Sequence, residues 1–388
     1  SCTTDTNGAT VTIYGKGDYT GTASKTFISV SKLAIKCKDI AYTGNEVTPA
    51  VTAKNGETEL TLNTDYTVSY SNNVNVSEKA IATVKGRGNY YGSVDVPFQI
   101  YNDIGAVLKT YSLSLNGLIE FNFYFELSDT LLQDTEAYAL FILPDGRQQK
   151  QYVKDAVHKN GKYGFTCGLY AKEMTQDVFI QIINGKGEHT QKYAYAIEDY
   201  VNYVLNSSSA AYLNVKPLIK AMMNYGGYAQ DEFSAYVDDK AYKNVKAEFE
   251  DEMNLIDASD FSEYAFKQIS TDNNFSPRSL SLILEEATTL RFYIKVADES
   301  KVSSAIVKVN GITTSLGKNN KGYYVDVPAI KSNKLDEIYT IQINGLEVQC
   351  SALSYMYSFL RYSTNEVDTA VAKALYIYYL RSKAYFGE

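Results

Sequence analysis

Alternation of apolar and polar residues dominates this chain. Segment 118–127 is apolar at every second residue from Ile119 to Leu127, which predicts a strand with one buried face. Segments 111–115, 137–143, 162–169 and 177–183 predict further strands. The period then lengthens to that of amphipathic helices at 193–205 and 213–232, with Pro217 in the first turn of the second helix. A block of strands followed by two helices is therefore expected between residues 105 and 235.

The same order of elements is repeated near the end of the chain. Leu290, Phe292 and Val296 correspond to Phe121, Phe123 and Leu127, and the predicted turn Asn344-Gly345 corresponds to Asn184-Gly185. The strands expected here are 280–284, 290–296, 304–309, 322–327 and 338–343, and the helices are 350–362 and 366–385. Ser363 and Glu366 predict a capping box at the second helix.

This repetition predicts one fold unit used twice, in residues 105–235 and 278–388. Each copy is expected to be an α+β unit, a β-sandwich-like sheet layer with a helical hairpin packed on it. The two copies are expected to dock, because their helices would otherwise leave apolar surface exposed. The polar and acidic segment 236–277 between them is expected to be a linker with a short helix.

The N-terminal part shows short strands separated by turn clusters and no helical period. This pattern predicts an immunoglobulin-like β-sandwich in residues 30–104, so the whole chain is expected to be mainly β. The glycine-rich segment 86–92 has a counterpart at 15–21, and residues 1–29 are therefore expected to be the C-terminal hairpin of a preceding, truncated repeat. The glycines join strand to strand, which indicates a turn and not a nucleotide-binding loop.

Composition narrows the classes of function. Hydrophobic residues make up 45% of the chain and charged residues 21%, as in folded proteins. The net charge of -8, without a block of Lys or Arg, argues against nucleic-acid binding. No apolar run approaches the length needed to insert in a membrane. Cys2, Cys37, Cys167 and Cys350 lie too far apart for a zinc knuckle, and Cys2 with Cys37 is the one pair considered for a disulfide.

Few residues suggest chemistry. His158 and His189 lack the spacing of a metal site or a catalytic triad. Glu120 and Glu126 are the candidate glycosidase pair, but solvated charges on an outer sheet face are the favoured interpretation. Asp5, Asn7 and Gly8, and the acidic run 248–252, do not follow a calcium-binding loop. No catalytic residue, metal or cofactor is predicted.

Tyrosine offers the candidate binding residues, since the chain contains 35 Tyr and no Trp. Tyr124 and Tyr293 occupy corresponding positions on the polar face of corresponding strands, and Tyr90 and Tyr91 lie at a predicted loop tip. Exposed rings can stack on sugars and anchor protein interfaces. These four are the predicted ligand-binding residues, and packing of Tyr124 and Tyr293 beneath the helices is the alternative.

Several sequence segments resemble those of known protein families. The phrases DYTVSYSNN at 65–73 and VKGRGNYYGSVDVPFQI at 84–100 resemble immunoglobulin-like repeats of surface proteins of gut clostridia. The phrases GLIEFNFYFEL at 117–127 and AKALYIYYLRSKAYF at 372–386 resemble a tandem strand-and-helix module near the C-termini of secreted proteins of these bacteria. The resemblance implies an extracellular, surface-attached protein of a Gram-positive gut bacterium.

The function expected from these observations is non-catalytic. The leading hypothesis is adhesion or ligand binding at the cell surface, with the immunoglobulin-like part as a spacer and a host or plant glycan or a surface protein as partner. The first alternative is a carbohydrate-binding accessory module of a polysaccharide-degrading system. A glycoside hydrolase is the least favoured.

Overall fold

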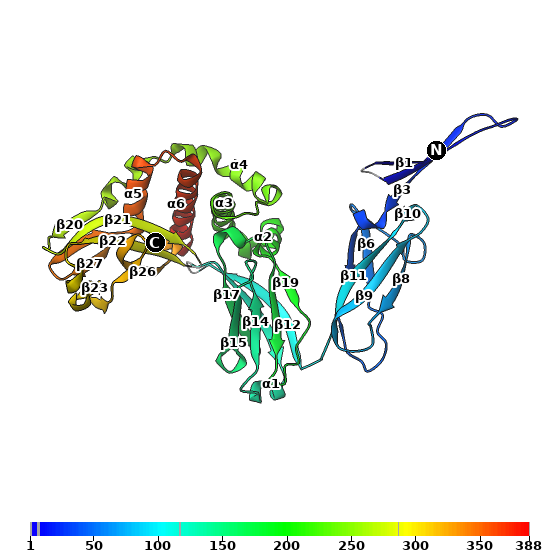
Figure 1. The fold of residues 1–388 in the computed structure, drawn as a ribbon, viewed down its shortest axis with the longest axis horizontal. Helices are drawn as coiled ribbons and strands as arrows, with labels where there is room; N and C mark the ends of the chain where they lie inside the picture. Colours follow the sequence, from blue (N-terminus) through cyan, green and yellow to red (C-terminus); the bar gives the residue numbers. More distant parts are fainter. Residues whose placement is uncertain (1, 6–7, 116–117, 286, 388) are drawn as a thin grey trace.

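The computed structural model describes residues 2–5, 8–115, 118–285 and 287–387, and it confirms a mainly β chain. Figure 1 shows an N-terminal hairpin, a strand-rich part, and two parts that contain both strands and helices, arranged along the longest axis of the molecule. No helix among the described residues is long and apolar enough to cross a membrane.

The N-terminal hairpin consists of antiparallel strands. Strand β1 (Cys2–Asp5) pairs with β2 (Gly8–Tyr14), which pairs with β3 (Thr22–Ser29). Strand β10 (Tyr90–Tyr91) joins this sheet by pairing with β3 in parallel. The hairpin is therefore attached to the next part of the chain through backbone hydrogen bonds as well as through the chain itself.

Residues 30–104 form two sheets around a shared core. One sheet has the order β5 (Ile40–Ala41), β11 (Ser93–Tyr101), β9 (Ser77–Gly86) and β8 (Tyr66–Ser71), and the other has β4 (Ala34–Cys37), β6 (Val51–Asn55) and β7 (Thr58–Glu59). Buried Ala53 and Val84 come from different sheets and belong to one apolar cluster. Cys37 is a free thiol, and burial together with Asp39 raises its pKa to about 11. The side chain of Cys2, the one candidate disulfide partner considered for Cys37, lies outside the described part.

Residues 105–235 form a second pair of sheets covered by helices. The sheet orders are β12 (Ala106–Ser114), β13 (Glu120–Leu127), β17 (Lys162–Gly168), β16 (Val157–Lys159), and β15 (Gln148–Tyr152), β14 (Tyr138–Ile142), β18 (Val178–Ile183), β19 (Tyr193–Tyr195). Inward-facing Phe121, Phe123 and Phe125 of β13 are fully buried, as the alternation predicts. The helices are α1 (Asp129–Gln133), α2 (Ile197–Asn206) and α3 (Lys216–Phe233).

The C-terminal part contains sheets of similar topology. The sheet orders are β21 (Phe275–Leu284), β22 (Thr288–Val296), β26 (Gly322–Ile330), β25 (Gly317–Asn319), and β20 (Lys267–Ser270), β28 (Leu346–Cys350), β27 (Tyr339–Ile343), β23 (Val307–Val309), β24 (Ile312–Thr314). The bulge in the β12–β13 pair lies beside Tyr124, and the bulge in the β21–β22 pair lies beside the corresponding Tyr293. The helices here are α5 (Ala352–Tyr362) and α6 (Glu366–Phe386).

Short 3-10 helices connect many of these elements. They are η1 (Val30–Lys32), η2 (Val153–Asp155), η3 (Ala171–Glu173), η4 (Ala210–Tyr212), η5 (Ala258–Tyr264), η6 (Glu299–Ser304) and η7 (Ser332–Lys334).

The segment interpreted as a linker is more structured than expected. Helix α4 (Asp239–Leu255) has 17 residues, and β20 and the first residues of β21 also fall within 236–277. Two glutamates of the acidic run pair with neighbouring helices: Glu248 lies 2.6 Å from Lys220 of α3, and Glu252 lies 2.6 Å from Arg381 of α6. The sequence alone suggests a solvated linker here, because the Lys and Arg partners of these glutamates lie far away along the chain.

Helices α3 and α6 pack against each other and join the two helix-bearing parts (Figure 1). Their rings Tyr225 and Tyr378 stack with centroids 6.0 Å apart. The predicted capping box at α6 is wrong, because Ser363 ends α5 and Asn365 is the residue before α6. The Asn365 side chain accepts hydrogen bonds from the backbone N–H groups of Val367 and Asp368, which satisfies the free donors at the start of that helix.

Candidate binding groove

Two of the predicted binding tyrosines pack on the sheets themselves. Tyr124 is partly buried, and its ring lies so close to Gly164 that a Cβ there would come within 3.1 Å of Tyr124 Cε1. Tyr293 is only 6% exposed, accepts a hydrogen bond from Asn319 at 3.0 Å and meets Tyr324 edge to face. The contacts described for both rings are with neighbouring strands and not with helices. Because Tyr293 is almost fully buried by them, little of its ring is accessible to a ligand.

The other two tyrosines lie elsewhere. Tyr90 is partly buried against the core of residues 30–104, and Tyr91 beside it is 39% exposed. No contact described here joins Tyr90 or Tyr91 to Tyr124 or Tyr293. The four predicted residues therefore do not form one site.

The structure instead places a groove along strand β21, which sequence reasoning did not find. Three adjoining cavities of about 580, 170 and 340 Å³ follow the strand. The first and second share Tyr355 and Phe359 of α5, and the second and third share Phe233, Leu282 and Leu284. We call this continuous depression the β21 groove.

The two end cavities of the groove lie against the edge of β21, whereas the middle cavity contacts the alternate residues Leu282 and Leu284 on one of its faces. The first cavity is lined by the consecutive residues 277–280, and the third by the consecutive residues 282–285. A cavity over one face of a strand would contact every second residue, because successive side chains point to opposite faces. Among the described strands β21 pairs only with β22, so its other edge carries backbone donors and acceptors without a strand partner.

Aromatic side chains form the opposite wall. Tyr355 and Phe359 of α5 stack with centroids 5.3 Å apart, and Tyr362 at the end of that helix is 74% exposed. Phe233, the last residue of α3, is 47% exposed and lines the second and third cavities. The groove is therefore an apolar channel with exposed rings beside an open strand edge.

Acidic side chains meet near the middle of the groove. Asp368 of α6 lines the second cavity, and Glu232 of α3 lies next to Asp368. Burial, together with the hydrogen bond and the repulsion from Asp368, raises the pKa of Glu232. Neither carboxylate is paired with a Lys or Arg among the described ion pairs.

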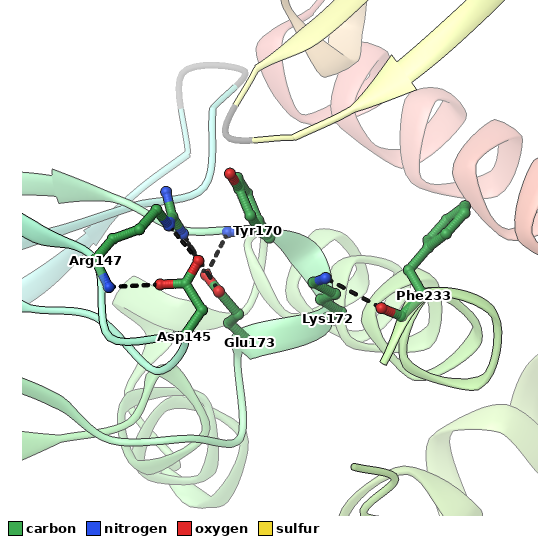
Figure 2. Close-up of polar contacts among 6 residues, drawn as sticks. All are labelled: Asp145, Arg147, Tyr170, Lys172, Glu173 and Phe233. Atoms are coloured by element: carbon green, nitrogen blue, oxygen red, sulfur yellow. Dashed lines mark hydrogen bonds and ion pairs between the residues drawn. The ribbon is translucent and has the colours of Figure 1, made fainter. Parts of the chain in front are cut away.

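A basic and aromatic cluster lies beside the third cavity, which its members Tyr170, Lys172 and Phe233 line (Figure 2). Lys172 donates to the backbone carbonyl of Phe233 at 3.1 Å, and Arg147 lies 3.9 Å above the ring of Tyr170. Arg147 pairs with Asp145 at 2.5 Å and with Glu173 at 3.1 Å. This cluster holds the loop that carries Tyr170 and Lys172 against the end of α3.

Glu173 in this cluster is only 2% exposed. Burial raises its pKa, and the raising effect exceeds the opposing effects of the Tyr170 N–H donor at 3.0 Å and of Arg147. Its buried position and its hydrogen bonds indicate a structural role.

A second, polar cleft of about 800 Å³ lies between helices α3, α4 and α6. Its lining includes Tyr228, Lys243, Lys246, Glu250, Glu366 and Lys373. Lys246 pairs with Asp231 at 2.7 Å and lies 4.9 Å from the centre of the Tyr228 ring. Charged and aromatic groups thus line this cleft, whereas apolar groups dominate the β21 groove.

The carboxylates and histidines considered for catalysis are separated. Glu120 and Glu126 lie six residues apart on one strand, roughly 20 Å at ~3.3 Å per residue, which exceeds the spacing of glycosidase pairs. Glu126 pairs with Lys109 at 2.8 Å, and His158 stacks on Tyr163. His189 Nδ1 lies 2.8 Å from the Thr190 carbonyl.

Metal ligands are not gathered in the described part of the chain, where no group of three His, Cys, Asp or Glu could hold an ion. The candidate calcium segment at Asp5, Asn7 and Gly8 includes Asn7, which lies outside the described residues. Neither protein-family models nor curated proteins give a match to this chain. Its function therefore has to follow from its own residues, above all those of the β21 groove.

Proposed function

We propose that this chain is a non-catalytic extracellular protein that acts in adhesion at the surface of a Gram-positive gut bacterium. In this proposal residues 30–104 are an immunoglobulin-like spacer, and residues 105–235 and 278–388 are two copies of one α+β unit. The matching strand orders and the bulges beside Tyr124 and Tyr293 support a duplication. The stack of the corresponding residues Tyr225 and Tyr378 supports docking of the two copies through equivalent helices.

The observation that carries the binding role is the β21 groove. A few side chains, often aromatic, that become buried when the partner binds supply most of the binding free energy of protein interfaces. A stretch of exposed Tyr and Phe beside an open strand edge also carries a solubility and aggregation cost, which favours a function for it. The resemblance to clostridial surface proteins suggests that the partner belongs to the host, to food or to another cell.

Adhesion can be measured with beads that carry the full chain, applied to mucus-producing intestinal cells and to surfaces coated with host or plant polysaccharides. We expect retention above that of uncoated beads, and on the order of tenfold lower retention for Tyr362→Ala, which removes an exposed ring of the groove. Tyr203→Ala removes a 62% exposed ring outside the groove and should not change retention. Retention no better than that of uncoated beads on every surface would contradict the proposal.

The polar cleft between α3, α4 and α6 favours a second candidate, a carbohydrate-binding accessory module. Sugars bind where an aromatic face lies beside several charged or amide groups, and Tyr228 with Lys243 and Glu250 offers that combination. Electrophoresis through gels that contain single polysaccharides tests it. Retardation that is lost in Tyr228→Ala but kept in Tyr362→Ala would favour this candidate over adhesion through the groove.

A further inference from the structure

We propose that the β21 groove binds an extended peptide segment of a protein partner, which pairs with β21 as an added strand. The segment would place apolar side chains in the groove cavities and a Lys or Arg against Glu232 and Asp368. This inference rests on the proposed binding function and names its ligand class. It is argued from the strand edge, the cavities and the charges.

The strand edge supplies the first reason. The groove follows β21 from Pro277 to Glu285, about 26 Å at ~3.3 Å per residue, which matches an extended peptide of roughly nine residues. An added strand would satisfy the open edge of β21 with backbone hydrogen bonds, and α5 would form the second wall. Grooves between an edge strand and a helix bind peptides in this way, with affinity from the backbone and specificity from side-chain pockets.

The cavities supply the second reason. The cavity of about 580 Å³ beside Tyr355 and Tyr362 has room for an aromatic side chain, and that of about 170 Å³ beside Leu282 and Met356 suits a smaller aliphatic one. Sugar hydroxyls would lose hydrogen bonds to water on such walls without gaining partners. The apolar walls therefore favour a peptide over a glycan at this site.

Charge supplies the third reason. Glu232 and Asp368 come from different helices, lie next to each other and repel, and the described ion pairs leave both without a cation. A cationic side chain of the partner placed between them would remove this repulsion. Lys172 at the far end is held by the Phe233 carbonyl, and Arg278 at the near end donates to the Lys321 carbonyl, so neither neutralises the acidic pair.

The probe is a phage-displayed library of linear 12-residue peptides, panned on the immobilised full chain. The best peptide is then synthesised with a fluorophore and titrated with the chain by anisotropy. We expect enriched peptides to alternate apolar and polar residues and to contain a basic residue. Hydrogen exchange of the β21 amides should slow when the peptide binds, since an added strand protects backbone groups that side-chain docking leaves open.

Three variants test the location. Ser358→Trp fills the first cavity from α5 and should weaken binding at least about tenfold, whereas Thr313→Trp, on the exposed edge strand β24, should leave it within about twofold. Glu232→Lys should weaken binding by on the order of tenfold, and a peptide with Glu in place of its basic residue should restore it. Glu232 lies at the C-terminal turn of α3, where a Lys is well tolerated. Melting curves that match the parent establish that each variant is folded.

Each outcome decides the matter. Failure of any peptide to enrich, equal binding by Ser358→Trp, or unchanged exchange in β21 would overturn the proposal. A chain that dimerises through the groove, shown by loss of the dimer in Ser358→Trp, would also overturn it. Bead adhesion that persists in Ser358→Trp would leave the proposed function standing and remove only the peptide groove.

Discussion

The stack of Tyr225 on Tyr378 predicts that residues 105–235 and 278–387 unfold as one unit. The two side chains are 5% and 3% exposed. Burial of a tyrosine removes about 200 Å² from water, which at ~25 cal/mol/Å² gives an upper value of about 5 kcal/mol. We therefore expect Tyr225→Ala and Tyr378→Ala each to lower the free energy of unfolding by about 3–5 kcal/mol.

The coupling between these two rings is the sharper test. Their centroids are 6.0 Å apart, so the double variant should lose less than the sum of the single losses, by about 0.5–1.5 kcal/mol or more. Urea unfolding gives the free energies, and hydrogen exchange read from fragments of both parts shows where protection is lost. Tyr362→Ala on α5, where the ring is 74% exposed, is the matched control and should cost little. If Tyr225→Ala lowers protection only within 105–235, the two parts unfold independently and the reasoning is refuted.

Three further predictions concern single residues. Gly226→Ala should lower the free energy of unfolding by about 1–3 kcal/mol, because a Cβ there would lie 2.9 Å from the Ala171 carbonyl oxygen. This loss is expected although alanine favours helices, and an unchanged or higher melting temperature would contradict it. Glu173→Gln should be at least as stable as the parent in urea near neutral pH, because burial disfavours the carboxylate. The stability difference should shrink as the pH falls towards 4.5, the ordinary pKa of a glutamate, because Glu173 of the folded parent then takes up a proton. A stability difference that grows on acidification would refute this reasoning. Asn365→Ala should cost about 1 kcal/mol in urea unfolding through loss of the cap on α6, whereas Asn365→Asp should not, so equal stability of the two variants would argue against the cap.

The sequence predicted regular elements well where the pattern was local. Period-2 alternation located β13 and β22, and the helical period located α3 and α6 to within a few residues. Turns were less predictable. Asn344-Gly345 forms a two-residue turn in which Ile343 pairs with Leu346. A two-residue turn was also expected at Asn184-Gly185, but the structure has a wider turn there. The Asn184 N–H donates to the Glu188 carbonyl and closes this turn, and Gly187 with a φ of 81° allows it.

The groove depends on contacts that no local pattern contains. Phe233 ends a helix of the first unit, Leu282 lies on the edge strand of the second, and Phe359 lies on a later helix. Period-2 alternation places a tyrosine on an outer sheet face. It does not show how much of that ring is covered by residues of the neighbouring strands. That is why Tyr293 was predicted as a ligand-binding residue although Asn319 and Tyr324 enclose it.

The proposed duplication also allows edge strand β21 to be compared with its counterpart β12. In the first unit, Tyr111 on edge strand β12 pairs with Phe123, and its ring lies 4.3 Å from that of Tyr195 and 6.4 Å from that of Tyr200 of α2. The corresponding position of β21, which pairs with Phe292, is the smaller Leu280. Tyr111 thus fills space beside α2 in the first copy, whereas in the second copy a cavity remains between Leu280 and the rings of α5. Because the two proposed copies share a topology but not this filling, we expect binding through a strand edge at the second copy and not at the first.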